Sequence, residues 1–246
     1  MKADPSVQLR LLALQEIDSR IVQLRHQRAS LPVLGEISTL EKERLGIVDE
    51  MRDAQIKVDD LSVEQKRADA DVEQVKSRRT RDRERMDAGL ITNPKDLSRM
   101  QSELESLERR ISTLEDAELE VMEQLEEAQQ VHAALQIRVA DIDARLAELL
   151  STRDASWATI DEDLAGVSAS RPPAAADMPE DLIKLYERLR ESKGVAVAEL
   201  RQRRCGGCQL TLDNAELAQI KSAPLDDVVR CEECTRILVR TAESGL

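Results

Sequence analysis

Aromatic residues are nearly absent from this chain of 246 residues, which has one Trp, one Tyr and no Phe. A globular domain of this size normally buries several large aromatic side chains. Charged residues instead make up 35% of the chain, with much Ala, Glu, Leu and Arg, which is typical of a coiled coil. The chain also lacks the roughly 18 consecutive apolar residues of a membrane span and the apolar block of a signal peptide. We therefore expect a soluble, cytoplasmic, mainly α-helical protein with no membrane partner.

Motifs of the common enzyme classes are missing as well. There is no P-loop and no GxGxxG, and the two histidines, His26 and His132, are far apart in the sequence. A helical stalk offers no concave pocket of the kind that holds a small-molecule substrate. We expect a protein that is not an enzyme, with no catalytic residues and no small-molecule substrate. His132 is interpreted as a polar residue tolerated in the hydrophobic seam, in preference to a second metal site.

Apolar residues recur at heptad spacing through the middle of the chain, which predicts a coiled coil. One register holds Met100, Leu107, Leu114, Val121, Ala128, Leu135, Ile142 and Leu149, and the other holds Leu97, Leu104, Ile111, Glu118, Leu125, His132, Val139 and Leu146. A less regular pattern covers residues 37–79. Between the two patterns, Asn93 and Pro94 predict an N-cap and the first residue of a new helix. A connection this short makes the two helices antiparallel neighbours.

These patterns predict three parts. Residues 1–166 form an antiparallel coiled-coil hairpin, with a break near residues 31–35 and a tip near residues 86–95. Residues 167–179, rich in Pro, Ala and Ser, form a linker. Residues 180–246 form a helix, capped by Asp177 and ended at Gly194, followed by short antiparallel strands that a metal holds together.

The chain has four cysteines, in two Cys-x-x-Cys pairs separated by 22 residues. The pairs are Cys205-Gly-Gly-Cys208 and Cys231-Glu-Glu-Cys234. Four thiolates in two tight turns are the ligand set of a tetrahedral Zn²⁺ site, so we predict one structural zinc ion. Iron in a rubredoxin-like site, a redox dithiol and disulfides are the alternatives. The redox alternative needs only one such pair on a βαβ background, and nothing marks the chain as secreted.

Several segments resemble a known family. The segments DLIKLYERLRESKGVAVAEL, CGGCQLTL and RCEECTRIL, with GLITNPKDL at the tip, are similar to the bacterial family of coiled-coil proteins with a C-terminal C4-type zinc ribbon. The resemblance implies a non-catalytic regulator that binds nucleic acid or the transcription apparatus. That family typically has Gly-Arg after the fourth cysteine, whereas Thr235 stands at the Gly position here. This departure concerns the backbone of the second cysteine turn and leaves the ligands in place.

The net charge of −13 argues against a protein that binds nucleic acid with its whole surface. Residues 111–137 contain seven acids and no Lys or Arg, and we interpret this stretch as a solvated helix face or as a docking surface for a basic protein. Basic residues gather at two places, which we expect to contact nucleic-acid phosphates, RNA or DNA, or to be ordinary surface charge. The tip cluster is Lys76, Arg78, Arg79, Arg81, Arg83 and Arg85, and the cluster beside the metal is Arg201, Arg203, Arg204, Arg230, Arg236 and Arg240.

Three functions fit these features. The first is regulation through contact with nucleic acid or with a transcription-related protein, made by the ribbon and the hairpin tip. The second is a protein–protein adaptor that binds no nucleic acid. The third is an RNA-polymerase channel factor that inserts its coiled-coil tip, although the approach to this tip is net basic, whereas such factors place acidic side chains there.

Overall fold

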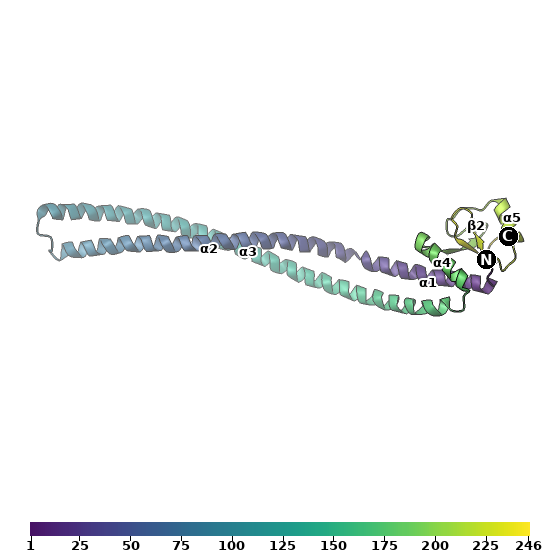
Figure 1. The fold of residues 1–246 in the computed structure, drawn as a ribbon. Helices are drawn as coiled ribbons and strands as arrows, with labels where there is room; N and C mark the ends of the chain where they lie inside the picture. Colours follow the sequence, from purple (N-terminus) through teal and green to yellow (C-terminus); the bar gives the residue numbers. More distant parts are fainter. The chain divides into compact units, whose positions relative to one another are not determined.

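The computed structural model describes the whole chain, residues 1–246, as five helices and four short strands (Figure 1). Their order is α1 (Pro5–Ala29), α2 (Pro32–Asp87), α3 (Pro94–Ala175), α4 (Glu180–Lys193), β1 (Val197–Arg201), β2 (Arg204–Cys205), α5 (Asn214–Ser222), β3 (Val229–Arg230) and β4 (Ile237–Arg240). The chain divides into two units. We call Gly35–Leu150 the hairpin unit, and Met1–Leu34 with Ser151–Leu246 the ribbon unit.

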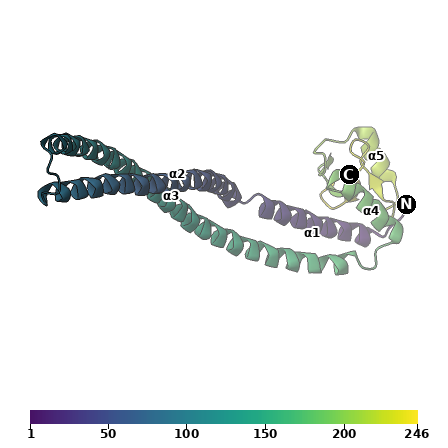
Figure 2. The same ribbon diagram turned by 60° about the vertical axis from the view of Figure 1, so that its left-hand side comes forward.

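In the hairpin unit, α2 and α3 lie side by side and antiparallel, as both ribbon views show (Figures 1 and 2). All sixteen predicted seam positions of α3 are buried or half-buried. Leu61 of α2 packs against Leu125 and Ala128 of α3 in the middle of this seam. The predicted coiled-coil hairpin is therefore confirmed, because the heptad pattern places one apolar stripe of each helix against the other.

At the tip of the hairpin unit, the chain reverses over a short connection. Gly89 has a φ of 67°, in the left-handed region that glycine adopts without strain. The side chain of Asn93 then accepts a hydrogen bond of 3.0 Å from the amide of Lys95, which caps α3 as the sequence predicts. The two helices are also joined by ion pairs across the seam, such as Arg44 with Asp143. These pairs are exposed, so the seam contributes more to stability than they do.

In the ribbon unit, the strands pack against helices from distant parts of the sequence. The hydrophobic core there contains Leu11 and Leu14 of α1, Leu182 and Tyr186 of α4, and Ile237 of β4, all fully buried. A second core beside the cysteines is built from Leu200, Leu212, Leu217, Ile220 and Leu238, together with Cys205 and Cys231. The strands therefore share a hydrophobic core with the helices, and the metal is not the only element that holds them.

The sheet has the strand order β2-β1-β4-β3. β2 and β3 pair antiparallel with their neighbours, but β1 and β4 are parallel, with Val197 opposite Ile237. The prediction of antiparallel strands alone was wrong for this central pair. Parallel strands need a long connection, and here residues 202–236, with both cysteine turns and α5, supply it.

The predicted linker, residues 167–179, is mostly helical, because α3 continues to Ala175 with Pro172 and Pro173 inside it. Proline normally disfavours a helix interior. Tertiary contacts outweigh that preference here: Ala174 and Ala175 pack on the core, and the guanidinium of Arg10 donates a hydrogen bond to the carbonyl of Ala176. The prediction that Asp177 caps α4 was also wrong. Pro179 is the cap residue, and no side chain caps α4, whereas Gly194 ends it with a φ of 74°.

Candidate metal centre and basic surfaces

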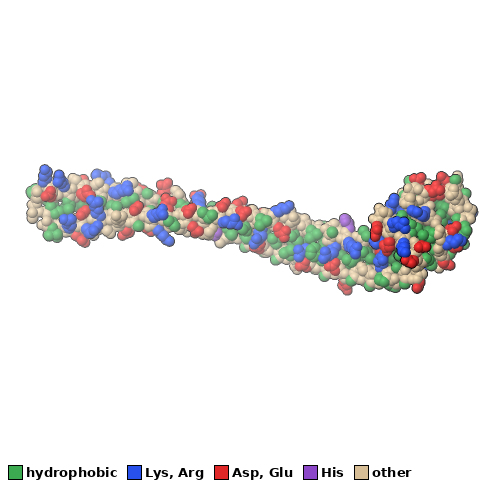
Figure 3. All heavy atoms as spheres, viewed as in Figure 1, with side chains coloured by type: hydrophobic (Ala, Val, Ile, Leu, Met, Phe, Trp, Pro, Cys, Tyr) green, Lys and Arg blue, Asp and Glu red, His purple; other side chains and the backbone are tan.

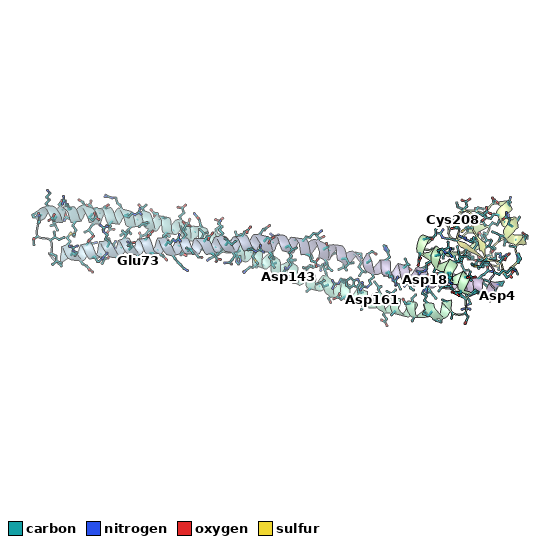
Figure 4. All side chains as sticks on the ribbon, in the orientation of Figure 1. Asp4, Asp18, Glu73, Asp143, Asp161 and Cys208 are labelled. Carbon is teal, nitrogen blue, oxygen red and sulfur yellow. The ribbon has the colours of Figure 1, made fainter.

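The four cysteine side chains converge in the ribbon unit, where all four sulfur atoms lie within 4.8 Å of one another. The Sγ atoms of Cys205 and Cys234 are 3.7 Å apart, and those of Cys208 and Cys231 are 3.9 Å apart. A tetrahedral zinc ion with Zn–S bonds of about 2.3 Å requires sulfur atoms about 3.8 Å apart. The donor set and its spacing therefore fit one Zn²⁺ ion. Cys205 and Cys231 are buried, whereas Cys208, labelled in Figure 4, and Cys234 are half-buried.

Each cysteine pair lies in a turn with the same two backbone hydrogen bonds. The carbonyl of Cys205 accepts from Gln209, and its amide donates to Leu210, at 2.8 and 2.9 Å. In the second turn, the carbonyl of Cys231 accepts from Thr235, and its amide donates to Arg236, at 2.9 and 3.0 Å. The two turns are thus equivalent, and each brings both of its thiols to the same side.

The fifth residue of each turn has a left-handed backbone conformation. The φ angle is 65° at Gln209 and 64° at Thr235. Thr235 stands where the resembling family has glycine, and its backbone adopts the conformation that glycine adopts without strain. A β-branched residue is a genuine outlier in this region. The second turn therefore has the same backbone geometry as the first, although Thr235 is strained in this conformation.

Glycine is needed inside the first turn because the turn lies directly on β1. A Cβ atom at Gly206 would lie 2.9 Å from the carbonyl oxygen of Glu199, which is closer than real Cβ atoms approach. The amide of Gly206 also donates a 2.9 Å hydrogen bond to that same oxygen. The Cys-Gly-Gly-Cys sequence therefore suits a cysteine turn that packs against a strand.

The second turn is held by α5 through a residue that the sequence analysis missed. A carboxylate oxygen of the buried Glu216 accepts a hydrogen bond of 3.1 Å from the amide of Glu232, between the two cysteines. Asp213 caps the same helix by accepting a hydrogen bond of 2.7 Å from the amide of Glu216. The spacing Asp213-x-x-Glu216 is that of a capping box and was the available sequence signal.

The thiols differ in how readily they lose their protons. Burial raises the pKa of Cys205 to about 12. Burial also acts to raise the pKa of Cys234, but hydrogen bonds with the backbone and side chain of Arg236 outweigh it and lower that pKa to about 7. Zinc binds thiolates, so loading this site releases protons and becomes more favourable as the pH rises.

The six arginines of the ribbon cluster have different roles. Arg240 donates five hydrogen bonds to the carbonyls of Ile220, Ala223, Pro224, Leu225 and Asp227. Arg236, directly before β4, is half-buried and donates to the carbonyl of Val195 at 2.9 Å. Arg240 and Arg236 therefore hold the ribbon together. Arg230 is exposed and donates to the carbonyl of Thr235.

The remaining three arginines flank the turn between β1 and β2. Arg201 forms an ion pair of 2.8 Å with Glu243. Arg203 and Arg204 donate to the carbonyls of Gly245 and Gln209, both at 3.1 Å. All three arginines are exposed. The structure therefore brings together only half of the predicted ribbon cluster as one exposed basic surface.

The tip cluster also divides into two sets. Lys76, Arg78 and Arg79 form ion pairs across the seam with Glu115, Glu103 and Glu108. Arg81 donates to the carbonyl of Ser77 in its own helix, and no acid pairs with Arg81, Arg83 or Arg85. Figure 3 shows basic side chains gathered at this tip. The three unpaired arginines are the ones whose charge is available to a partner.

Two family models match this sequence. The CT398-like coiled coil hairpin domain matches residues 14–194, and the C4-type zinc ribbon domain matches residues 204–238, which include all four cysteines. The sulfur geometry and the second match agree on one structural Zn²⁺ ion. In addition, no helix is both long enough and apolar enough to cross a membrane.

Relatives match over nearly the whole chain. The uncharacterised protein Rv2229c of Mycobacterium tuberculosis (strain ATCC 25618 / H37Rv) is 35% identical over 240 residues, which are 98% of each chain. A solved structure from Mycobacterium smegmatis is 32% identical, with a TM-score of 0.86, and covers 98% of this chain and 100% of its own. CT398 from Chlamydia trachomatis shares the fold at 17% identity, with a TM-score of 0.73 and coverage of 96% and 98%.

Proposed function

This chain belongs to the family of CT398-like coiled-coil hairpin proteins with a C4-type zinc ribbon, and from this premise we propose that it is a non-catalytic regulator that binds nucleic acid. The contact surface is the exposed turn between β1 and β2, residues 201–204, which we call the arginine turn. The observation that carries the proposal is the strained and anchored backbone of this turn, which presents two arginines without acidic partners.

The arginine turn is a two-residue turn with an uncommon sequence. Gln202 and Arg203 have φ angles of 47° and 65°, and turns of this type usually contain Asn or Gly at these positions. Each such non-glycine residue costs about 1 kcal/mol or more, and strain of this kind tends to persist at functional sites. The turn is also anchored, because the amides of Gln202 and Arg203 donate to the carbonyls of Glu243 and Ser244. The arginine turn is therefore presented in one fixed conformation.

The charges of the arginine turn favour an anionic partner. Arg203 and Arg204 donate only to carbonyl oxygens, so their positive charges are not neutralised by an acid. A guanidinium that keeps free N–H donors can bind phosphate in a bidentate way. No aromatic side chain accompanies the turn, so base stacking does not contribute. We infer contact with the phosphate backbone, which gives affinity without sequence preference.

The unpaired tip arginines, Arg81, Arg83 and Arg85, are a second surface of the same chemistry, in the hairpin unit. Each of the two surfaces can act alone, and they are therefore tested separately. The acidic side chains in the middle of α3 repel phosphate, so we do not expect nucleic acid to bind there.

The test is the salt dependence of binding to a fluorescent 20-nucleotide RNA and to a DNA duplex of the same sequence. Phosphate contacts release counterions, so affinity falls as salt rises, and removal of two contacts flattens the logarithmic slope by about two. We expect this for Arg203→Ala/Arg204→Ala. The control is Arg52→Ala/Lys57→Ala, which removes the same charge from exposed positions of α2 and leaves the slope unchanged.

Two results would redirect the proposal. If the wild-type protein binds neither probe at low salt, the protein is an adaptor for other proteins. If the protein binds but the double variant keeps its slope, the Arg81→Ala/Arg83→Ala/Arg85→Ala variant tests the tip. Binding to purified RNA polymerase that is lost in this tip variant would favour the channel-factor alternative.

A further inference from the structure

Negative charge is concentrated in one part of the hairpin unit. Residues 58–73 of α2 and 114–128 of α3 contain thirteen acids and two bases, which is a net charge of −11. The whole chain has a net charge of −13, so the rest of the chain is nearly neutral. The two segments are neighbours across the seam, where Leu61 packs against Leu125 and Ala128.

Carboxylates from the two helices approach each other here. The nearby carboxyl group of Asp69 on α2 raises the pKa of Glu118 on α3 above its usual value. Repulsion between neighbouring carboxylates is unfavourable in the hairpin unit when no partner is bound. The only two bases in the segments are Lys66 and Arg67, and both are exposed. Lys76, just outside the segments, pairs with Glu115, but the other twelve acids form no ion pair, so the negative potential of this region is largely uncompensated within the chain.

Apolar side chains lie in the middle of this acidic region. Leu119 and Met122 of α3 are 56% and 42% exposed, and they lie three residues apart on one face of the helix. Together with Gln65 of α2, they line a hollow of about 540 Å³ between the helices. Glu123 and Glu126 also line this hollow. We call this surface the acidic hollow.

The charge of the acidic hollow decides which partner fits it. Nucleic acid is repelled, and so is the acidic hollow of a second copy of this chain. A basic segment of another protein is attracted, and it covers Leu119 and Met122 if its apolar residues form a stripe. The hollow lies between two adjacent helices, which is where a third helix packs in a bundle.

From the exposed apolar pair, the hollow and the charge around them, we propose that the acidic hollow docks a basic amphipathic helix of a partner protein. Apolar residues of that helix fill the hollow against Leu119 and Met122, and its Lys or Arg residues face Glu123 and Glu126. This proposal does not depend on nucleic-acid binding at the arginine turn, which lies in the ribbon unit and has the opposite charge. The two proposals can therefore be tested independently of each other.

The test uses a fluorescent 18-residue peptide with Leu at helical seam positions and Lys elsewhere. A second peptide has the same composition, with Leu spread around the helix. Binding is measured by anisotropy at about 150 mM salt, where weak long-range attraction is screened. We expect Leu119→Ser/Met122→Ser to weaken binding of the amphipathic peptide about tenfold, and Glu123→Gln/Glu126→Gln to weaken it similarly.

Matched controls separate docking at the hollow from general attraction. Leu45→Ser/Ile137→Ser removes two residues of the hairpin unit that are each 63% exposed and lie outside the hollow. Glu41→Gln/Glu50→Gln removes two exposed acids of α2. Both control pairs should keep the wild-type affinity within about twofold.

Three results would overturn the proposal. One is equal weakening in the hollow variants and their controls, and another is equal affinity for the two peptides. The third is self-association of the wild-type protein in sedimentation that Leu119→Ser/Met122→Ser abolishes, because the occupant would then be a second copy. All substituted residues are exposed, so circular dichroism should show unchanged helix content in every variant.

Discussion

The phenol of Tyr186 on α4 donates a hydrogen bond of 2.7 Å to the carboxylate of Asp18 on α1, and both side chains are buried. Arg171 of α3 donates to both oxygens of the same carboxylate, at 2.6 and 3.1 Å. Asp18 thus joins three helices that are far apart in the sequence (Figure 4). Burial alone would raise the pKa of Asp18, but the bonds from Arg171 and Tyr186 keep it below its usual value.

Substitutions in this group should destabilise the ribbon unit to different degrees. Asp18→Asn removes the carboxylate that Arg171 and Tyr186 share, leaves Arg171 with Glu187 as its remaining acidic partner, and should cost about 3 kcal/mol. Tyr186→Phe removes one hydrogen bond to a charged group and should cost about 1.5 kcal/mol. The free energy of unfolding in urea measures both. Asp163→Asn is the control, because its exposed pair with Arg20 is 3.9 Å long, and a comparable loss in this control would contradict the assignment.

Removal of zinc should unfold the region around the cysteines and spare the hairpin unit. The second core of the ribbon unit contains Cys205 and Cys231, whereas the seam of α2 and α3 has no contact with the metal. Metal analysis should give one zinc per chain. With a strong chelator, amide exchange should become fast at Gln209 and Thr235 while the helical circular dichroism largely persists. Simultaneous loss of both signals, or a protein without zinc, would count against this account.

Thr235→Gly should stabilise the protein. Thr235 has a φ of 64°, and glycine adopts this conformation without strain. Relief of the strain outweighs the greater freedom of glycine in the unfolded chain, so the expected gain is about 1 kcal/mol. Thermal unfolding of the zinc-loaded protein measures it. The control is Thr211→Gly, in the same module at a residue with ordinary φ, which should not stabilise. A loss of stability in Thr235→Gly would show that the threonine side chain makes a contact worth more than the strain.

Leu125→Asp should destabilise the hairpin unit by about 3 kcal/mol or more, because it places an unpaired charge in the seam. Leu125 is buried against Leu61, whereas Glu123, two residues earlier, is exposed. Glu123→Ala should therefore change the free energy of unfolding by no more than about 0.5 kcal/mol. Urea unfolding followed by circular dichroism compares the two, and equal effects would mean that the seam register is wrong.

The hairpin and the metal ligands could be predicted because their signals are local or periodic. Heptad spacing alone identifies Leu107, Leu125 and Leu135 as seam residues. The two Cys-x-x-Cys pairs likewise identify all four metal ligands, because the spacing within each pair brings its two thiols to one side of a turn. The parallel pairing of β1 with β4 could not be predicted. It depends on long-range packing against α1, where Gln15 accepts a hydrogen bond of 2.7 Å from the amide of Ala196.

The sequence around an arginine also could not predict whether its side chain holds the fold together or is exposed. Arg240 and Arg204 are both basic residues near cysteines, yet the first binds five carbonyls inside the fold and the second is exposed. The guanidinium groups of Arg28 and Arg153 lie over the ring of Trp157, at 4.4 and 4.6 Å from its centroid. Such partners are set by the tertiary fold and leave no trace in spacing or composition.

The central claim is that the arginine turn contacts phosphate, and arginine-selective ¹⁵N NMR tests it most directly. The side-chain guanidinium signals of Arg203 and Arg204 are recorded while a short RNA or DNA is added at low salt, with Arg240 as an internal reference. We expect the signals of Arg203 and Arg204 to shift, and those of Arg240, whose two terminal NH₂ groups donate to five carbonyls, to stay unchanged. Unchanged signals at the arginine turn, under conditions where the nucleic acid binds elsewhere on the protein or not at all, would contradict it.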